Sequence, residues 1–285
     1  MAPTSTQTLM WADRSARGKL RFTGSQRGWF LHQILTQHYE DIEPGDARAA
    51  TLLTAHGRMV GYMEVVATED ALLMHFEPEL MDTLPEAIRF YVFSTDVQIE
   101  DVTGEMDLLL VAGKGAEGAV GELGPSVVIH RTDELGIEAF YVWVPKGHLS
   151  GVAATIGEKG GRPATEEDLE AIRIANGMPR WGREMDDKTF PQEVAIDERA
   201  VHYDKGCYVG QEAMAKIHLR GKVNRRLRTL EAPEALQPGD ELRDGEDKVG
   251  TVTSWVGKTG LGMLKFTVYP GDLVTAGDQK VKVTG

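Results

Sequence analysis

The sequence predicts an α+β protein of several parts that ends in a small all-β domain. The chain has 285 residues, which is long for one domain. Up to about residue 220, helical and strand patterns alternate. After Gly221 only short strand candidates remain, and they are separated by the turns Pro238-Gly239-Asp240, Asp244-Gly245 and Pro270-Gly271-Asp272. Such spacing of turns is typical of a small β-barrel.

The individual elements follow from periodicity and capping signals. Apolar residues recur at helical spacing after Ser25, and a second helix is predicted to begin at Thr83. A third helix begins after Thr165, with acids in its first turn, and stops at Asn176-Gly177. The segment 181–204 is polar and irregular, and long ordered loops of this kind often line sites. Strands are predicted at 48–66 (two strands), 97–102, 108–112, 127–130 and 139–144.

Composition narrows the class of protein. The single cysteine, Cys207, excludes an intrachain disulfide and is too few for an iron–sulfur cluster, so the cytoplasm is the expected compartment. No apolar run reaches the roughly 20 residues that span a bilayer, and no membrane association is expected. The net charge of −13 disfavours general nucleic-acid binding. Residues 1–17 have no apolar core and are predicted to form a flexible tail.

The charge is unevenly distributed along the chain. Residues 213–230 contain no acid but six lysines and arginines, together with His218. Two interpretations stay open. The window is either a basic connector docked against acidic domains or a site for an anionic ligand, in which Arg220 would take part.

Two further patterns lead to no predicted site. Residues 113–118 match the dinucleotide-binding pattern G-x-G-x-x-G. Too few residues follow before Gly124-Pro125 for a crossover helix, so a turn into a short helix is predicted instead. His202, Cys207 and His218 are of metal-ligand type, but their spacing fits no zinc pattern and no metal site is predicted.

The most informative segment is Lys205-Gly206-Cys207-Tyr208-Val209-Gly210-Gln211-Glu212. Its two glycines allow a tight turn, and good helix formers follow Gly210. Cys207 is therefore expected just before a helix N-terminus and beside Lys205, surroundings that favour the reactive thiolate. An inert, buried thiol in a turn is the alternative.

This octapeptide resembles the K-G-C-[FY]-x-G-Q-E signature of the YgfZ family of folate-binding proteins. With further similarity near 20–39, 52–65, 173–179 and 190–193, the resemblance spans about residues 18–230. It implies the fold of the glycine-cleavage T protein, a folate-dependent aminomethyltransferase. That fold has two ferredoxin-like or Greek-key α/β halves and a C-terminal β-barrel around a central folate pocket. The expected halves are 18–95 with 165–220, and 96–164, and the expected barrel is 221–285.

The resemblance also implies site residues. The transferase's pterin-side tyrosine falls at Trp181, its paired aspartates at Gly61 and Tyr62, and its pterin-binding glutamate at Ala175. One of the paired aspartates is catalytic in the transferase, so two acids that methyl-transfer chemistry uses, this aspartate and the glutamate, are missing. The expected functional thiol is Cys207, with Lys205 beside it. The residues expected to bind tetrahydrofolate or a related folate are Tyr62, Arg173, Met178, Trp181, Tyr208, Gln211, Glu212 and Arg220.

Three functional hypotheses follow. The first is a folate-binding accessory protein that assists the assembly or repair of iron–sulfur client proteins, including enzymes that modify tRNA. The second is a tetrahydrofolate-dependent aminomethyltransferase or demethylase, which the missing acids disfavour. The third is a cysteine hydrolase, for which His202 or His218 must lie within hydrogen-bond distance of Cys207.

Overall fold

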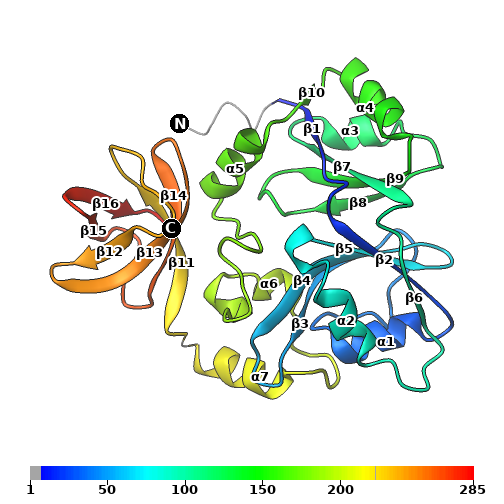
Figure 1. The fold of residues 1–285 in the computed structure, drawn as a ribbon, viewed down its shortest axis with the longest axis horizontal. Coiled ribbons are helices and arrows are strands. Elements are labelled where there is room, and N and C mark those ends of the chain that lie inside the picture. The colour runs from blue at the N-terminus through cyan, green and yellow to red at the C-terminus, as the bar shows by residue number, and fades with distance from the viewer. Residues whose placement is uncertain (1–7, 222) are drawn as a thin grey trace.

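The fold has three lobes, and a computed structural model describes it over residues 8–221 and 223–285, apart from the side chain of Arg220. Figure 1 shows two α/β lobes on one side and a β-barrel on the other. The segment that contains α5 (Glu166–Ala175) runs between the barrel and the α/β lobes. No helix in the described part is long and apolar enough to cross a membrane.

The first lobe is an antiparallel sheet with the strand order β3-β4-β5-β2-β6. Residues of α1 and α2 join one of its faces in a common apolar core. Because side chains alternate along a strand, the other face of β4 and β5 points toward the second lobe, where Val66 and Leu73 join its core. The elements are β2 (Gly18–Thr23), α1 (Arg27–Ile34), β3 (Ala47–Leu53), β4 (Met59–Ala67), β5 (Leu72–Phe76), the 3₁₀ turn η2 (Pro78–Leu80), α2 (Leu84–Arg89) and β6 (Gln98–Asp101).

The second lobe is a sheet with the order β10-β1-β7-β9-β8. Its outer face packs on α3 and α4, and its inner face packs on the first sheet and on α5. The predicted turn into a short helix at residues 113–118 is confirmed, because α3 has five residues. The elements are β1 (Met10–Asp13), β7 (Met106–Ala112), α3 (Ala116–Val120), β8 (Val128–Thr132), β9 (Ala139–Pro145), α4 (Leu149–Glu158) and β10 (Arg162–Pro163).

The predicted flexible tail over residues 1–17 is wrong for its described part, residues 8–17. Strand β1 pairs with β7 on one side and β10 on the other, and Met10 is fully buried. Four residues are too few to show a reliable strand pattern, so only the pairing partners reveal this strand. The halves also interleave more than predicted: β6 belongs to the first sheet although it lies beyond residue 95, and β1 belongs to the second.

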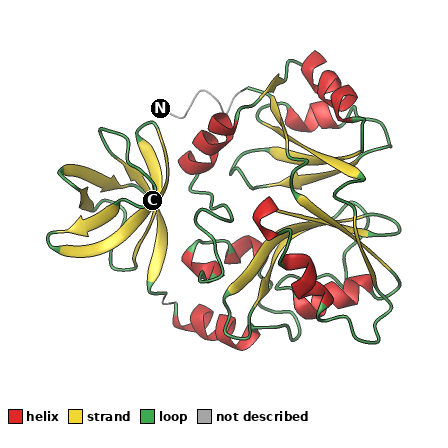
Figure 2. Ribbon diagram, viewed as in Figure 1, coloured by secondary structure: helices red, strands yellow, loops and turns green. Residues whose placement is uncertain are grey.

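The connection from α5 to the barrel contains little regular structure until α7 (Gln211–Arg220), as Figure 2 shows. It includes the short turns η3 (Pro191–Glu193) and α6 (Asp197–Ala200). The N-terminus of α5 is capped as predicted, because Thr165 and Asp168 form a reciprocal capping box. Helix α7 begins directly after Gly210, also as predicted.

The C-terminal lobe is a closed barrel with the strand order β11-β14-β13-β12-β15-β16, and the predicted β-barrel is confirmed. It has its own apolar core, and its strands β13 and β14 lie against α5. The strands are β11 (Arg225–Glu231), β12 (Glu241–Asp244), β13 (Asp247–Val256), β14 (Thr259–Lys265), β15 (Leu273–Ala276) and β16 (Gln279–Val283).

Candidate functional site

A central pocket lies where the two sheets, α5 and the loop after α5 meet. Its cavity volume is about 30 Å³, room for roughly two water molecules. The pocket is narrow because its own charged side chains occupy it. Its walls are Arg14, Arg17, Tyr62, Met63, Glu64, His75, Phe76, Glu77, Glu134, Leu135, Leu169, Glu170, Arg173, Pro179, Arg180, Trp181, Met185 and Arg199.

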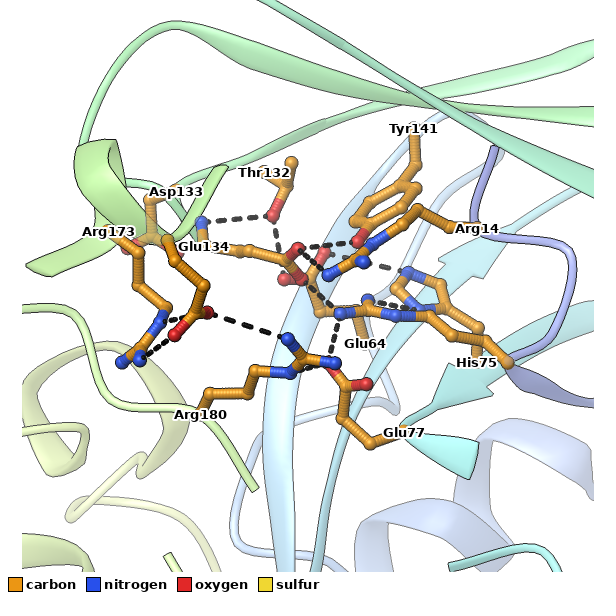
Figure 3. A network of polar contacts seen from close by, with 12 residues as sticks. Arg14, Glu64, His75, Glu77, Thr132, Asp133, Glu134, Tyr141, Arg173 and Arg180 are labelled. Atoms are coloured by element: carbon orange, nitrogen blue, oxygen red, sulfur yellow. Dashed lines mark hydrogen bonds and ion pairs between the residues drawn. The ribbon is translucent and has the colours of Figure 1, made fainter. Parts of the chain in front are cut away.

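Ion pairs between buried groups fill the pocket (Figure 3). Arg17 donates to Glu77 and lies 2.7 Å from Glu134, which also accepts from the Tyr141 hydroxyl at 2.7 Å. Burial opposes the charge of Arg17, but Glu134 and Glu77 outweigh it and raise the pKa of Arg17 well above its usual value. At the rim, Arg180 lies 3.6 Å from Glu77. The strands and the loop after α5 are therefore linked through compensated charges.

A second buried cluster joins the two sheets. Nε2 of His75, Nε2 of His130 and one carboxylate oxygen of Glu64 converge, with separations of 3.3, 3.4 and 3.8 Å. Such separations suit metal ligands, but Nδ1 of His75 faces Arg17 Nη1 at 3.2 Å. Arginine can only donate, so Nδ1 of His75 accepts this hydrogen bond. In the neutral ring the proton is then on Nε2, which has no lone pair left to bind a metal ion. With Thr132 donating to Glu64 at 2.7 Å, the cluster acts as a hydrogen-bonded joint between the sheets.

This cluster predicts acid sensitivity. Burial, followed by the charge of Arg17, lowers the pKa of His75 well below its usual value. Below about pH 6.5 the unfolded chain therefore binds a proton that the folded protein does not, and stability falls as pH decreases. We expect the free energy of unfolding in urea to fall between pH 7 and pH 5.5, and to fall less steeply in His75→Gln. His148→Gln is the control, and equal slopes in all three proteins would contradict the assignment.

Three of the predicted folate-binding residues line the central pocket. Trp181 is 7% exposed and forms part of the wall. The hydroxyl of Tyr62 is buried there without a hydrogen-bond partner. Arg173 reaches the pocket too, but its donors are occupied by Glu170, Met178 O, Glu184 and Ser254 at 2.6–2.9 Å. Arg173 thus ties α5 to the barrel, and Met178 itself lies outside the pocket wall.

The signature segment lies elsewhere, so the prediction that it lines the pocket beside Trp181 is wrong. Lys205 Nζ donates to three carbonyls at the C-terminal end of α1, those of His32, Leu35 (2.7 Å) and Gln37 (2.8 Å). Burial lowers the pKa of Lys205 to about 7, while the three carbonyls favour the ammonium form. A side chain at Gly210 would meet Thr54 O at 2.5 Å, and φ there is +82°. These residues fix the segment on the first lobe.

The remaining residues of the segment are spread between the surface and the core. Cys207 is exposed, which excludes the buried thiol that was the alternative. Tyr208 packs in the core of the first lobe, whereas Glu212 is exposed and pairs with Lys216 at 2.6 Å. Gln211 donates to the carbonyl of Lys205 at 3.3 Å. None of these four residues lines the central pocket.

The hydrolase hypothesis required an imidazole beside the thiol. In the described residues no hydrogen bond joins Cys207 to His202 or His218, and His218 stacks on Tyr203 with ring centres 3.7 Å apart. In the basic window, Arg225 pairs with Glu193 at 3.0 Å and Arg228 donates to Val268 O at 3.3 Å. These two contacts fit a docked connector. The side chain of Arg220 and residue 222 lie outside the described part.

Sequence reasoning missed most of the charged wall. Arg14 and Arg17 lie in the supposed tail, and Arg199 lies in the irregular segment. A signal was present for Glu64 and His75, because each is a polar residue inside an otherwise apolar strand. A buried polar group needs a partner across the core, and that requirement alone could have marked both residues.

A side groove adjoins the central pocket between the first sheet and the β8–β9 turn. Its volume is about 560 Å³. Glu64 and Arg199 line both cavities, so the groove and the pocket meet at these residues. Its other walls are Gln37, His38, Asp41, Ala47, Arg48, Ala49, Arg131, Thr132, Asp133 and His202.

The fold is that of glycine-cleavage aminomethyltransferases. The chain superposes on aminomethyltransferase T of the glycine cleavage system from Bartonella henselae with a TM-score of 0.88. The match covers 99% of this chain and 86% of that one, at 17% identity. The class of protein is therefore an aminomethyltransferase-like α+β fold with a C-terminal β-barrel.

Sequence comparisons refine this class. Residues 224–285 match the family model "CAF17, C-terminal beta-barrel domain". A chloroplastic protein of Arabidopsis thaliana that is named as a transferase is 25% identical over 293 residues, covering 93% of this chain and 68% of that protein. The aminomethyltransferase of Rubrobacter xylanophilus is 26% identical over 275 residues, covering 85% of this chain and 70% of that protein.

Proposed function

We propose that this chain is a tetrahydrofolate-binding accessory protein of the YgfZ type. In this proposal it acts in the cytoplasm, on the assembly or repair of iron–sulfur proteins that include tRNA-modifying enzymes. The observation that carries the proposal is the aminomethyltransferase fold with a central pocket in which the positions that match the transferase's functional acids hold no acid. Such a pocket can retain a folate and lack its methyl-transfer chemistry.

The two positions that match the paired aspartates support this interpretation. A side chain at Gly61 would meet Leu84 Cδ1 at 2.9 Å and Leu80 Cδ1 at 3.3 Å, so this position faces packed apolar residues. The next residue, Tyr62, lines the pocket but offers no carboxylate. Ala175 likewise stands at the position of the pterin-binding glutamate.

The pocket walls fit a folate ring in chemistry, and they must move to admit one. Trp181 offers an aromatic face, and several buried donors lack partners. Ligand pockets usually measure about 300–1,000 Å³, far more than the central cavity. Arg180 is the most exposed of the pocket's arginines, at 19%, and it also pairs with Glu166 outside the pocket wall. In this proposal Arg180 withdraws as the ring enters, and Trp181 orients the ring.

The first experiment is calorimetric titration with tetrahydrofolate. Trp181→Ala is expected to weaken binding by about 2- to 10-fold, which corresponds to an aromatic contact of roughly 0.5–1.5 kcal/mol. Trp29→Ala is the control, because Trp29 is 44% exposed on α1 and outside the pocket. An unchanged affinity in Trp181→Ala, or no binding by the wild type, would remove the basis of this proposal.

An aminomethyltransferase remains the second candidate, because relatives at 22–26% identity carry that name. The two candidates differ in turnover. The accessory protein binds tetrahydrofolate without forming methylene-tetrahydrofolate when glycine-cleavage partner components are added, whereas the transferase forms it catalytically. The same assay with Tyr62→Asp tests whether the missing carboxylate alone limits the reaction.

A further inference from the structure

Buried donors without partners are concentrated in the central pocket. Among the described residues, nine buried side-chain atoms have no hydrogen-bond partner, and five of the nine belong to residues that line this pocket. All five can donate, because arginine has no acceptor atom and the tyrosine hydroxyl carries a proton. Unpaired buried donors are costly and few in folded proteins. The five atoms are Nε of Arg14, Arg17, Arg180 and Arg199 and the hydroxyl of Tyr62.

One of these donors, Arg199, stands at the junction with the side groove, and a second, the Tyr62 hydroxyl, lies in the central pocket wall beside it. Arg199 lines both cavities, and its guanidinium carbon lies 5.7 Å from the centre of the Tyr62 ring. Arg199 is loosely held: Nη1 is 3.5 Å from Asp133 and 3.8 Å from the sulfur of Met178. Arg173, with five close contacts, shows how a structural arginine is satisfied in the same pocket.

The junction is suited to a group that accepts hydrogen bonds. Glu64 also lines the junction, but its carboxylate already accepts from Thr132 at 2.7 Å and faces His130 at 3.3 Å. The groups without partners there are therefore donors, and Arg199 can neither accept a hydrogen bond nor lose its charge. A carboxylate has two oxygens with room for several donors, and hydrogen bonds to a charged group are the stronger kind. The groove volume of about 560 Å³ provides the space that the central pocket lacks.

We propose that the inner end of the side groove, at Tyr62 and Arg199, binds a carboxylate of a small organic acid. The acid lies in the side groove, and its carboxylate accepts from the Tyr62 hydroxyl and from Nε–H of Arg199. The inference deepens the proposed function and rests on it for the folate in the neighbouring pocket. The carboxylate comes either from a separate acid or from the glutamate part of the folate itself.

The test uses calorimetric titrations with four probes. Succinate is compared with its neutral analogue succinamide, and tetrahydrofolate with the amide of tetrahydropteroate, which lacks the glutamate and has no carboxylate. Each is titrated into wild type, Tyr62→Phe, Arg199→Met and the control Arg228→Met, whose side chain lies on the barrel. The wild type is expected to bind succinate and not succinamide, or to prefer tetrahydrofolate to the tetrahydropteroate amide. Each junction variant is expected to reduce that carboxylate-dependent affinity by about 10- to 100-fold, while the control does not.

The Tyr62→Phe variant has a second readout. Since it removes a buried hydroxyl without a partner, the ligand-free variant is expected to melt at the wild-type temperature or above it. A tyrosine that serves only the fold would lose stability and leave carboxylate binding unchanged. A lower melting temperature in the absence of ligand would therefore overturn the assignment of an unpaired donor.

The outcomes separate this inference from the proposed function. Succinate binding that depends on both residues indicates a separate acid, and a glutamate-dependent preference that depends on both indicates the folate itself. If tetrahydrofolate and the tetrahydropteroate amide bind equally and succinate does not bind, the inference fails and folate binding stands. If succinate binds through Tyr62 and Arg199 and no folate binds, the folate proposal fails and the carboxylate site stands.

Discussion

Replacing Glu184 by alanine is expected to destabilise the protein by about 3–5 kcal/mol, because three buried donors lose their common acceptor and each loss costs about 1–3 kcal/mol. The side chain of Glu184 is fully buried and pairs with Arg173 at 2.8 Å. It also accepts from Ser254 of the barrel at 2.6 Å and from the backbone N–H of Arg180 at 3.1 Å. One carboxylate thus joins α5, the loop after it and the barrel.

The measurement is urea unfolding followed by circular dichroism. Glu241→Ala is the matched control, because Glu241 also pairs with basic residues on the barrel but is exposed, and exposed pairs contribute little. The double variant Glu184→Gln with Arg173→Met should recover much of the loss, since it removes both charges. Equal stability of Glu184→Ala and wild type would show that the network does not hold the barrel.

Lys205→Met is expected to destabilise the protein by roughly 2–5 kcal/mol, whereas Cys207→Ser is expected to leave stability unchanged. Lys205 is 6% exposed and satisfies three carbonyls at the end of α1, and each buried carbonyl left unpaired costs about 1–3 kcal/mol. Cys207 is exposed and makes no such contact. The two signature positions, which are separated only by Gly206, therefore have opposite roles in this structure.

Thermal and urea unfolding of both variants test this separation. Under the proposed function, Cys207→Ser should also keep tetrahydrofolate binding and lose the proposed role in iron–sulfur enzyme activity, measured by complementation of a deletion strain. A stable Lys205→Met variant would mean that water replaces the ammonium. Full complementation by Cys207→Ser would show that the thiol has no functional role.

Local signals in the sequence were reliable where the structure depends on neighbours in the chain. The capping box at Thr165 and the end of α5 were predicted from residues three positions apart. The start of α7 followed from Gly210 and the helix formers after it. The barrel followed from its turns and from the resemblance. In the two helices the deciding interactions span a few residues, whereas the barrel closes by pairing between the distant strands β11 and β16 and was predicted only as a type of fold.

The family resemblance, unlike the local signals, predicted which residues meet at the central pocket, and it did so only in part. It placed Trp181 and Tyr62 at the central pocket, because both belong to motifs aligned with the transferase fold. It grouped residues 165–220 with 18–95, and therefore Lys205 with the first lobe, but it gave no indication that Lys205 would be bound to the end of α1. Lys205 meets Leu35, a residue 170 positions earlier in the chain, and no spacing within the octapeptide encodes that contact.

The sequence by itself determined the class of fold, the barrel, the missing acids and the exposed thiol's place before a helix. Only the tertiary structure decided what surrounds the central pocket, since Arg14, Glu134 and Arg180 come from three distant parts of the chain. It also decided that Arg173 is a structural residue, and that Arg199 stands loosely paired beside Tyr62. The physical reason is that a buried charge is defined by its partners, and these partners meet only when the sheets and the loop after α5 pack together.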